Sequence, residues 1–506
     1  MSQCKTFLRT IFFGICFLIG IMMLLLTSTT RFNRDIVGGL TYINYSLGSV
    51  HVQKPMLNGS QLLQDYNKKL FASSTRQNIV NLSLTNSNKS SSFGGNNITT
   101  DYATSTTSMF SLNVAENRNH LLSDYLYKFR WDKLENDINN PAVTSYRQKL
   151  IDGLQTFAYE EPRVPVNLSC MPPSLLDPRD INCSDYPNAF EENKHETPVK
   201  VAHAIMLGFD ADSLEIHLNE IYDVIDYFFI LEATKIHCQA MLKQLSWSEL
   251  SVQPRFAKFR KKIIHLVVDD SDIAPVKWSK DTSFKLEKLQ EHIRWNKIKK
   301  WNSVTKALSG QDIIGFGDAD EVASRKNIQL LKYCPLKYES VDIGIWFPFG
   351  RMDQAYKSDF PVSKEHKYTL GDPTFYIWEK ASQFAESTFP TRLRGESKGF
   401  LLGGVHLTYY TYVPYFILRL LSATECTEWT KQTVEKWFTN PLESFHEYHS
   451  LEGIENLITS RQNNTKLKLI DDVKEDLSSI ISRPWFYECN KERYPAWEGK
   501  HDTRVV

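Results

Sequence analysis

The sequence predicts an α/β fold in which a mainly parallel sheet carries helices on both faces. Apolar runs bounded by polar or glycine positions predict four strands, at residues 200–209, 226–234, 261–268 and 313–316. Helical spacing of apolar residues predicts helices at 212–223 and 284–308. Strands that alternate with helices favour parallel pairing, because each helix returns the chain to the end of the sheet at which the previous strand began.

Acidic residues follow several of the predicted strands, where a parallel sheet binds its ligands. Asp318 and Asp320 follow the fourth strand and stand one residue apart. Two carboxylates directed at one point repel each other unless a cation lies between them. A divalent metal that also holds a substrate diphosphate would satisfy both groups. The pattern therefore predicts a metal site at Asp318 and Asp320, which is the chemistry of a nucleotide-sugar transferase.

Two other interpretations of this motif stay open. Aspartates that follow a strand often do no more than solvate a turn. Residues 318–322 also match the nucleophile loop of haloacid-dehalogenase-like phosphatases, with Asp318 as the nucleophile. Such a phosphatase would place the aspartates after its first strand, whereas here they follow the fourth predicted one.

The overall charge gives no indication of a nucleic-acid partner. The 506 residues contain 59 basic and 59 acidic side chains, with a formal net charge of +0. A basic surface that tracks phosphates would require an excess of Lys and Arg. No nucleic acid is therefore expected among the partners.

The N-terminal part predicts a single-pass type II Golgi membrane protein with its catalytic domain in the lumen. Residues 11–30 carry no charge and can just cross a bilayer behind a cytosolic tail at 1–10. A cleaved signal peptide is the alternative. Residues 31–110 are rich in Ser, Thr and Asn and read as a disordered, glycosylated stem, with sequons at Asn44, Asn58, Asn81, Asn88 and Asn97.

The remaining chain divides into a transitional segment at 111–199 and a catalytic domain at 200–506. Further helices are predicted at 120–134, 430–438 and 474–481. Six cysteines follow the anchor and allow up to three disulfides in an oxidising compartment: Cys170, Cys183, Cys238, Cys334, Cys426 and Cys489. Cys170 and Cys183 are expected to form a local pair.

Five segments of the second half of the chain together resemble one enzyme family. They are GFDADSLEIHLNEIYDVIDYFFILEAT (208–234), FAKFRKKIIHLVVDD (256–270), GDADEVASRKNIQLLK (317–332), GGVHLTYY (403–410) and LRLLSA (418–423). In sequence, order and spacing they resemble the glycosyltransferase family of the bisecting enzyme, β-1,4-mannosyl-glycoprotein 4-β-N-acetylglucosaminyltransferase. The resemblance implies a GT-A fold, UDP-N-acetylglucosamine as donor, a glycoprotein N-glycan as acceptor and inversion at the anomeric carbon.

On this interpretation Asp320 ligates a divalent metal, expected to be Mn²⁺, and Asp318 contacts the metal through water or holds the donor ribose. Glu321 is a candidate for positioning the donor sugar. Glu232 either accepts hydrogen bonds from the nucleoside or caps the loop that follows it. His406, after a Gly-Gly pair, either binds the metal or diphosphate or has a structural role.

An inverting transfer also needs a general base for the acceptor hydroxyl. Asp353 and Glu396 lie in loop-like segments and are the candidates. Arg392, Arg394 and Lys398 either bind diphosphate or form a solvated basic loop. The tyrosines at 409, 410 and 412 either stack on sugars or belong to the core. A transferase for another sugar or acceptor, a lumenal metal-dependent phosphatase and a non-catalytic glycan-binding protein remain the alternatives.

Overall fold

The computed structural model describes residues 141–423 and 467–504, apart from 239–240, 270, 274–281, 349, 386–387, 409, 411, 475, 501 and 503. The predicted tail, anchor and stem lie outside these residues, as do the predicted helices at 120–134 and 430–438. Among the described segments, no helix combines the length and apolarity that crossing a bilayer requires.

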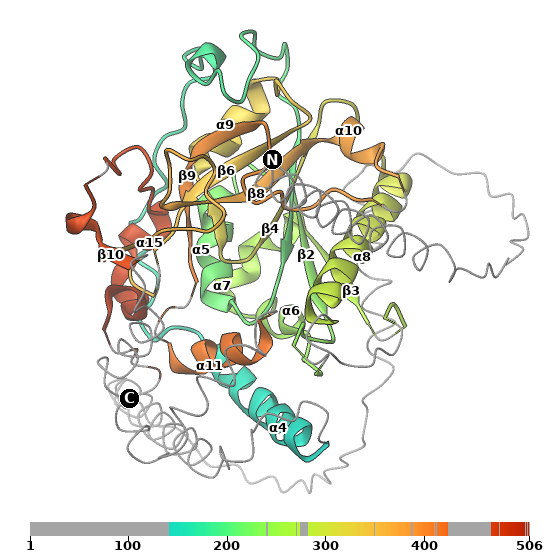
Figure 1. Cartoon of the computed structure of the whole chain (residues 1–506), viewed down its shortest axis with the longest axis vertical. Coiled ribbons are helices and arrows are strands. Elements are labelled where there is room, and N and C mark those ends of the chain that lie inside the picture. The colour runs from blue at the N-terminus through green and yellow to red at the C-terminus, as the bar shows by residue number, and fades with distance from the viewer. Residues whose placement is uncertain are drawn as a thin grey trace, which may run out of the picture. The chain divides into compact units, whose positions relative to one another are not determined.

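The described chain is built around one large mixed sheet (Figure 1). The strands are β1 (Val201–Met206), β2 (Tyr227–Ala233), β3 (Ile263–Val268), β4 (Ile313–Asp318), β5 (Glu321–Ala323), β6 (Ser340–Trp346), β7 (Gln354–Tyr356), β8 (Thr369–Ile377), β9 (Gly399–His406) and β10 (Leu467–Leu469). Eight of them form a sheet in the order β3-β2-β1-β4-β8-β6-β9-β5, and β10 pairs with β7 separately.

All four predicted strands are present, and β3, β2, β1 and β4 pair in parallel as expected. Beyond β4 the sheet contains both antiparallel and parallel pairs. Strand β8 is antiparallel to both β4 and β6, and β5 is antiparallel to β9, whereas β6 and β9 are parallel. The sheet is therefore mixed rather than uniformly parallel, because its second half contains strands that need no helical crossover between them.

Helices cover the sheet on both sides. They are α4 (Pro141–Ala158), α5 (Ala211–Ile221), α6 (Ser246–Leu250), α7 (Pro254–Ala257), α8 (Thr282–Thr305), α9 (Arg325–Tyr333), α10 (Trp378–Ser382), α11 (Val413–Ser422) and α15 (Trp485–Cys489). Short 3-10 helices occur at Cys183–Asp185, Lys258–Lys262, Ile470–Asp472, Lys491–Arg493 and Pro495–Glu498.

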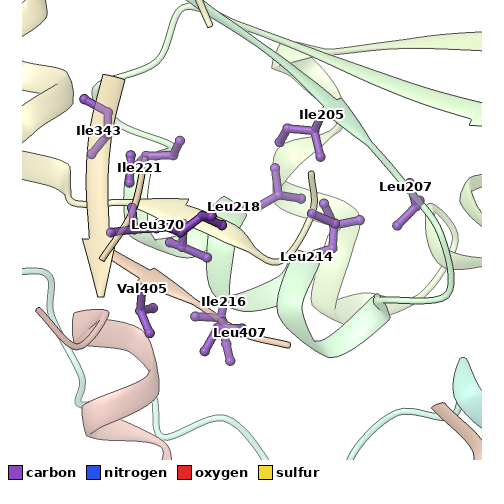
Figure 2. Packing of buried hydrophobic residues seen from close by; sticks show 14 of the residues in the cluster. Ile205, Leu207, Leu214, Ile216, Leu218, Ile221, Ile343, Leu370, Val405 and Leu407 are labelled. Atoms are coloured by element: carbon purple, nitrogen blue, oxygen red, sulfur yellow. The ribbon is translucent and has the colours of Figure 1, made fainter. Parts of the chain in front are cut away.

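Alternating side chains of β1 enter two separate cores, as strand geometry requires. Val201 and Ile205 join a cluster that includes residues of α5 and α9. Ala202 and Ala204 join another that includes Trp295 and further residues of α8. Figure 2 shows the first cluster, in which Ile216, Leu218 and Ile221 of α5 lie near residues of β6 and β9. The two clusters place α5 and α9 on one face of the sheet and α8 on the other.

The C-terminal part returns to the body of the domain. Helices α4 and α11 lie side by side, although they are far apart in the sequence (Figure 1).

The predicted helix at 474–481 is wrong, because residues 478–480 form a turn and no described residue of this segment is helical.

The predicted Cys170–Cys183 pair is also wrong. Cys170 is bonded to Cys489 at the end of α15, and Cys183 is bonded to Cys334 after α9. Cys238 is disulfide-bonded as well. Residues 170–190 extend along the domain surface, so each cysteine meets the element packed beside it rather than its neighbour in sequence. The two bonds fasten the segment before β1 to two distant parts of the chain.

Candidate active site

A cavity of about 310 Å³ opens at the carboxyl ends of the central strands. The last residue of β1, β2, β4 and β9 lines it in each case: Met206, Ala233, Asp318 and His406. This is the edge where an open α/β sheet binds its ligands. The walls combine a few apolar side chains with an unusual number of acidic and basic ones.

The acidic turn, residues 318–321, connects β4 to β5 at the floor of this cleft. Its backbone is fixed on both sides. The Ala319 N–H donates to Met206 O at 3.0 Å, and the Leu407 N–H donates to Asp320 O at 2.7 Å. Glu321 pairs with His406 in the antiparallel β5–β9 ladder. These bonds bring His406, far along the chain, directly opposite the acidic turn.

Arg392 is the main counter-charge of the turn. Its guanidinium donates to Asp318 Oδ2 at 2.5 Å and to Glu321 Oε1 at 3.2 Å. It also donates to Glu287 Oε1 at 2.8 Å and Glu291 Oε1 at 3.4 Å. Burial opposes its charge, but these four carboxylates hold its pKa well above the ordinary value. The other oxygen of Asp318, Oδ1, is buried and has no hydrogen-bond partner.

Asp320 lies beside His406. Its Oδ2 is 3.3 Å from His406 Nε2 and 3.9 Å from Arg419 Nη2. Asp320 Oδ2 and His406 Nδ1 are both buried without a hydrogen-bond partner. Burial raises the pKa of Asp320, but His406 and Arg419 outweigh it and hold the pKa below the ordinary value. Asp320 is therefore an ionised carboxylate at neutral pH.

The residues present fit a divalent cation only in part. Among the described residues, no group of three or more His, Cys, Asp or Glu side chains is arranged to hold an ion by itself. Asp318 and Asp320 nevertheless each carry a buried oxygen without a hydrogen-bond partner. A hard cation commonly takes one or two carboxylates and completes its shell with substrate phosphate oxygens and water. The acidic turn matches that donor set.

Two further buried acids of the cleft were not predicted from the sequence. Asp210 precedes α5 and is 5% exposed, but its side chain does not cap the helix and its Oδ1 has no hydrogen-bond partner. Burial, followed by the charge of Asp320, raises the pKa of Asp210 to about 6. The sequence did carry a signal for it, because Asp210 and Asp212 form a second Asp-x-Asp after a predicted strand. Asp212 instead forms buried ion pairs with Arg255 and Arg504.

Asp372 is the second unpredicted acid. It lies in β8, is 1% exposed and has an Oδ1 without a hydrogen-bond partner. Burial and the nearby charge of Glu321 raise its pKa well above the ordinary value. No sequence pattern marks this residue, because its role depends on which strand lies beside β4.

The structure separates Glu232 from the acids of the cleft. Glu232 is 1% exposed and does not line the cavity. It accepts hydrogen bonds from Lys243 Nζ at 2.9 Å, His265 Nε2 at 2.9 Å, and the backbone N–H groups of Ser246 and Trp247 at 2.6 and 2.8 Å. These bonds use its acceptor capacity and hold the first turn of α6. The geometry favours the capping role over nucleoside binding.

The predicted general bases also lie outside the cleft. Asp353 is exposed and ion-paired with Arg351 at 2.6 Å, and Glu396 is exposed; neither lines the cavity. Their catalytic role stays a prediction that this geometry does not support. Of the predicted basic residues, Arg392 and Arg394 line the cleft and Lys398 does not. Tyr410 and Tyr412 belong to the buried core, and residue 409 lies outside the described ones.

Comparison with known proteins adds one finding. Residues 180–343 match glycosyltransferase family 17. The match runs from the segment before β1 into β6 and includes the whole acidic turn. No curated protein matches the chain. A domain that resembles this family, with its acidic turn at the carboxyl ends of the strands, supports a glycosyltransferase.

Proposed function

We propose that the chain is an inverting N-acetylglucosaminyltransferase that moves N-acetylglucosamine from UDP-N-acetylglucosamine to a mannose of an N-linked glycan. The observation that carries this proposal is the acidic turn. Asp318 and Asp320 line the cleft at the strand ends, and each has one buried carboxylate oxygen that no residue of the described chain hydrogen-bonds. The match to glycosyltransferase family 17 supports the same reaction class.

The turn would hold a divalent cation, Mn²⁺ in this proposal, between Asp318 and Asp320. When bound, the cation supplies positive charge that stabilises the departing diphosphate. Arg392 keeps Asp318 in place, and His406 and Arg419 keep Asp320 ionised. Arg394, which is half-buried at the same cleft, adds positive charge on the side of β8.

Inversion requires one base that accepts the proton of the attacking hydroxyl. Asp210 is the candidate that the structure favours over Asp353 and Glu396. It lines the cleft, and its Oδ1 has no hydrogen-bond partner. A carboxyl with a pKa of about 6 is ionised at neutral pH and is still basic enough to take a proton in the transition state.

The proposed location follows from the N-terminal sequence. We propose a single-pass type II Golgi membrane protein, with an anchor at residues 11–30 and a glycosylated stem at 31–110. The disulfides at Cys170–Cys489 and Cys183–Cys334 are typical of a domain that folds in an oxidising compartment. N-glycans are processed in the same compartment, so the acceptor and the enzyme would meet there.

The test uses the full chain with UDP-N-acetylglucosamine, Mn²⁺ and a pool of released N-glycans. Mass spectrometry measures whether glycans gain one N-acetylhexosamine. Asp320→Asn is assayed in parallel, and Asp180→Asn serves as the matched control because it changes an exposed aspartate outside the cleft. We expect extension by the wild type and the control, and at least a hundredfold loss in Asp320→Asn, as for removal of a transition-state electrostatic group.

Other outcomes would overturn the proposal in distinguishable ways. Extension with another nucleotide sugar alone would replace the donor and keep the transferase. Release of phosphate from p-nitrophenyl phosphate, lost in Asp318→Asn and independent of any nucleotide sugar, would establish the phosphatase alternative. Glycan binding without any transfer would leave a glycan-binding protein.

A further inference from the structure

Phe360 is a half-exposed aromatic residue on the wall of the cleft. It is 49% exposed and lines the same cavity as Asp318 and Asp320. Single exposed hydrophobic side chains are common on protein surfaces and need no explanation by themselves. Phe360 differs from the others in its place within the cleft and in how firmly its backbone is held.

The backbone around Phe360 is fixed to the sheet. The Phe360 N–H donates to Ser358 Oγ at 3.0 Å, and the Gly371 N–H of β8 donates to Phe360 O at 2.9 Å. On the other side, Pro361 O lies so close to Gly395 that a Cβ there would stand 2.3 Å from it. The loop is therefore locked between β8 and the turn at 394–395, and its ring is presented to the cleft at a defined position.

Arg394 completes this surface. Its guanidinium lies over one face of the Phe360 ring, with the guanidinium carbon 5.6 Å from the ring centre, and its Nη2 is 3.4 Å from Glu287 Oε1. Arg394 has a φ of 51°, a left-handed conformation that is unfavourable for a residue with a Cβ. Strained backbone of this kind persists where the surroundings enforce it, and it clusters at ligand sites. An aromatic face and a positively charged hydrogen-bond donor thus stand together on one wall.

This pair lies on the β8 side of the acidic turn. In the sheet, β4 stands between β1 and β8, so the ends of β1 and β2 border the turn on its other side. There the cleft is lined by the apolar residues Leu207, Phe209 and Ile236. In the proposed function, the nucleoside of a donor whose diphosphate lies at the turn would occupy this side. An acceptor that approaches the turn from the β8 side would contact Phe360.

We propose that Phe360 and Arg394 form the acceptor subsite, in which the apolar C–H face of an acceptor pyranose stacks on the Phe360 ring and its hydroxyls accept hydrogen bonds from Arg394. The subsite rests on the proposed transferase function. A pyranose presents weakly positive C–H groups on one face and hydroxyls around its edge. The electron-rich face of the Phe360 ring complements the C–H groups, and the Arg394 guanidinium complements the hydroxyls.

The test compares Phe360→Ala and Phe360→Trp with Phe284→Ala in the full chain. Phe284, at the start of α8, is 53% exposed and does not line the cleft, so it is a matched control for loss of an exposed ring. Half-saturation is measured for the N-glycan pool and, separately, for UDP-N-acetylglucosamine. Saturation-transfer NMR with the pool reports glycan binding without turnover.

We expect Phe360→Ala to raise the half-saturating glycan concentration about tenfold, as the loss of one aromatic stacking contact does. The value for UDP-N-acetylglucosamine should change less than twofold. Phe360→Trp should keep the wild-type glycan value because it preserves an aromatic face, and Phe284→Ala should match the wild type.

Three results would overturn the subsite. Equal half-saturating glycan concentrations in Phe360→Ala and Phe284→Ala would show that the ring does not contact the acceptor. A loss of nucleotide affinity with unchanged glycan affinity would place the donor on Phe360 instead. A wild type that binds UDP-N-acetylglucosamine but no glycan would also refute it. If the wild type binds glycans through Phe360 but neither binds nor uses the nucleotide sugar, the proposed function fails and Phe360 remains a glycan-binding residue of a protein without transferase activity.

Discussion

Replacing Glu232 by Gln tests whether this residue is structural or binds the donor. Glu232 is a buried carboxylate that accepts four hydrogen bonds, two from Lys243 and His265 and two from the first turn of α6. Burial by itself raises the pKa of Glu232, but Lys243 and His265 outweigh it and lower the pKa to about 2. Glutamine has the same shape but offers one acceptor oxygen and no charge, so the two donors on one carboxylate oxygen would lose their partner. These are Lys243 and the Ser246 N–H on Oε1, or His265 and the Trp247 N–H on Oε2.

The expected loss of stability follows from the lowered pKa of Glu232. A carboxyl pKa that falls from 4.5 to about 2 corresponds to about 3 kcal/mol of folding free energy. Removing one member of a buried ion pair costs a similar amount, about 3–5 kcal/mol. Because the folded-state pKa is the lower one, this stability is fully present above pH 4.5 and is lost as the pH falls toward 2.

The assay is urea unfolding of the full chain, followed by tryptophan fluorescence at pH 7 and at pH 3. We expect Glu232→Gln to lower the free energy of unfolding by about 3 kcal/mol at pH 7 and by about half of that at pH 3. Glu249→Gln, an exposed change in the same helix, should change it by less than about 0.5 kcal/mol. A Glu232→Gln variant that unfolds like the wild type but loses affinity for UDP would refute this reasoning and restore the donor-binding role.

Three further predictions test the site and its support. Asp210→Asn should lower kcat by at least a hundredfold with little change in the half-saturating donor concentration. The wild-type rate should decrease as the pH is lowered through about 6, because Asp210 takes up a proton there. A pH profile that the substitution leaves unchanged would contradict this role. The ring of His217 must donate from Nδ1 to Ala319 O, 3.1 Å away, because a carbonyl only accepts. His217→Leu should therefore weaken Mn²⁺-dependent UDP binding about tenfold, whereas His217→Asn, which keeps a donor, should recover most of it by calorimetry. The double variant Cys183→Ser with Cys334→Ser opens a 151-residue loop and should lower the free energy of unfolding by about 4 kcal/mol, and reducing agent should then have less effect on it than on the wild type.

Local patterns in the sequence predicted the first half of the sheet. The four predicted strands exist and pair in parallel, and the acidic turn lies where the strand-end rule places a ligand site. These features depend on residues that are close in sequence, such as an apolar run followed by Asp-x-Asp. The antiparallel insertion of β8 beside β4 had no such signal, since strand order depends on which elements pack together.

The same distinction separates the acids of the site. Asp318 and Asp320 stand beside their own strand and could be predicted. Glu232 also ends a strand, yet the segment that follows it folds back and places the first turn of α6 on its carboxylate. Asp353 and Glu396 lie in loops as expected, but neither side chain lines the cavity, although Arg392 and Arg394 shortly before Glu396 do. The sequence shows that an acid is present, and only packing decides whether it faces a ligand or a neighbouring helix.

By itself, the sequence determined an α/β fold and an acidic turn at the end of the fourth predicted strand, because strand periodicity and the residues that follow a strand are local properties of the chain. Only the tertiary structure decided that His406 faces Glu321, that Asp210 and Asp372 enter the cleft, that Cys183 bonds to Cys334, and that Phe360 is held on the cleft wall. Each of these features depends on residues that are distant in the sequence. Their proximity is set by the burial of two hydrophobic clusters on opposite faces of the sheet, and no short pattern records it.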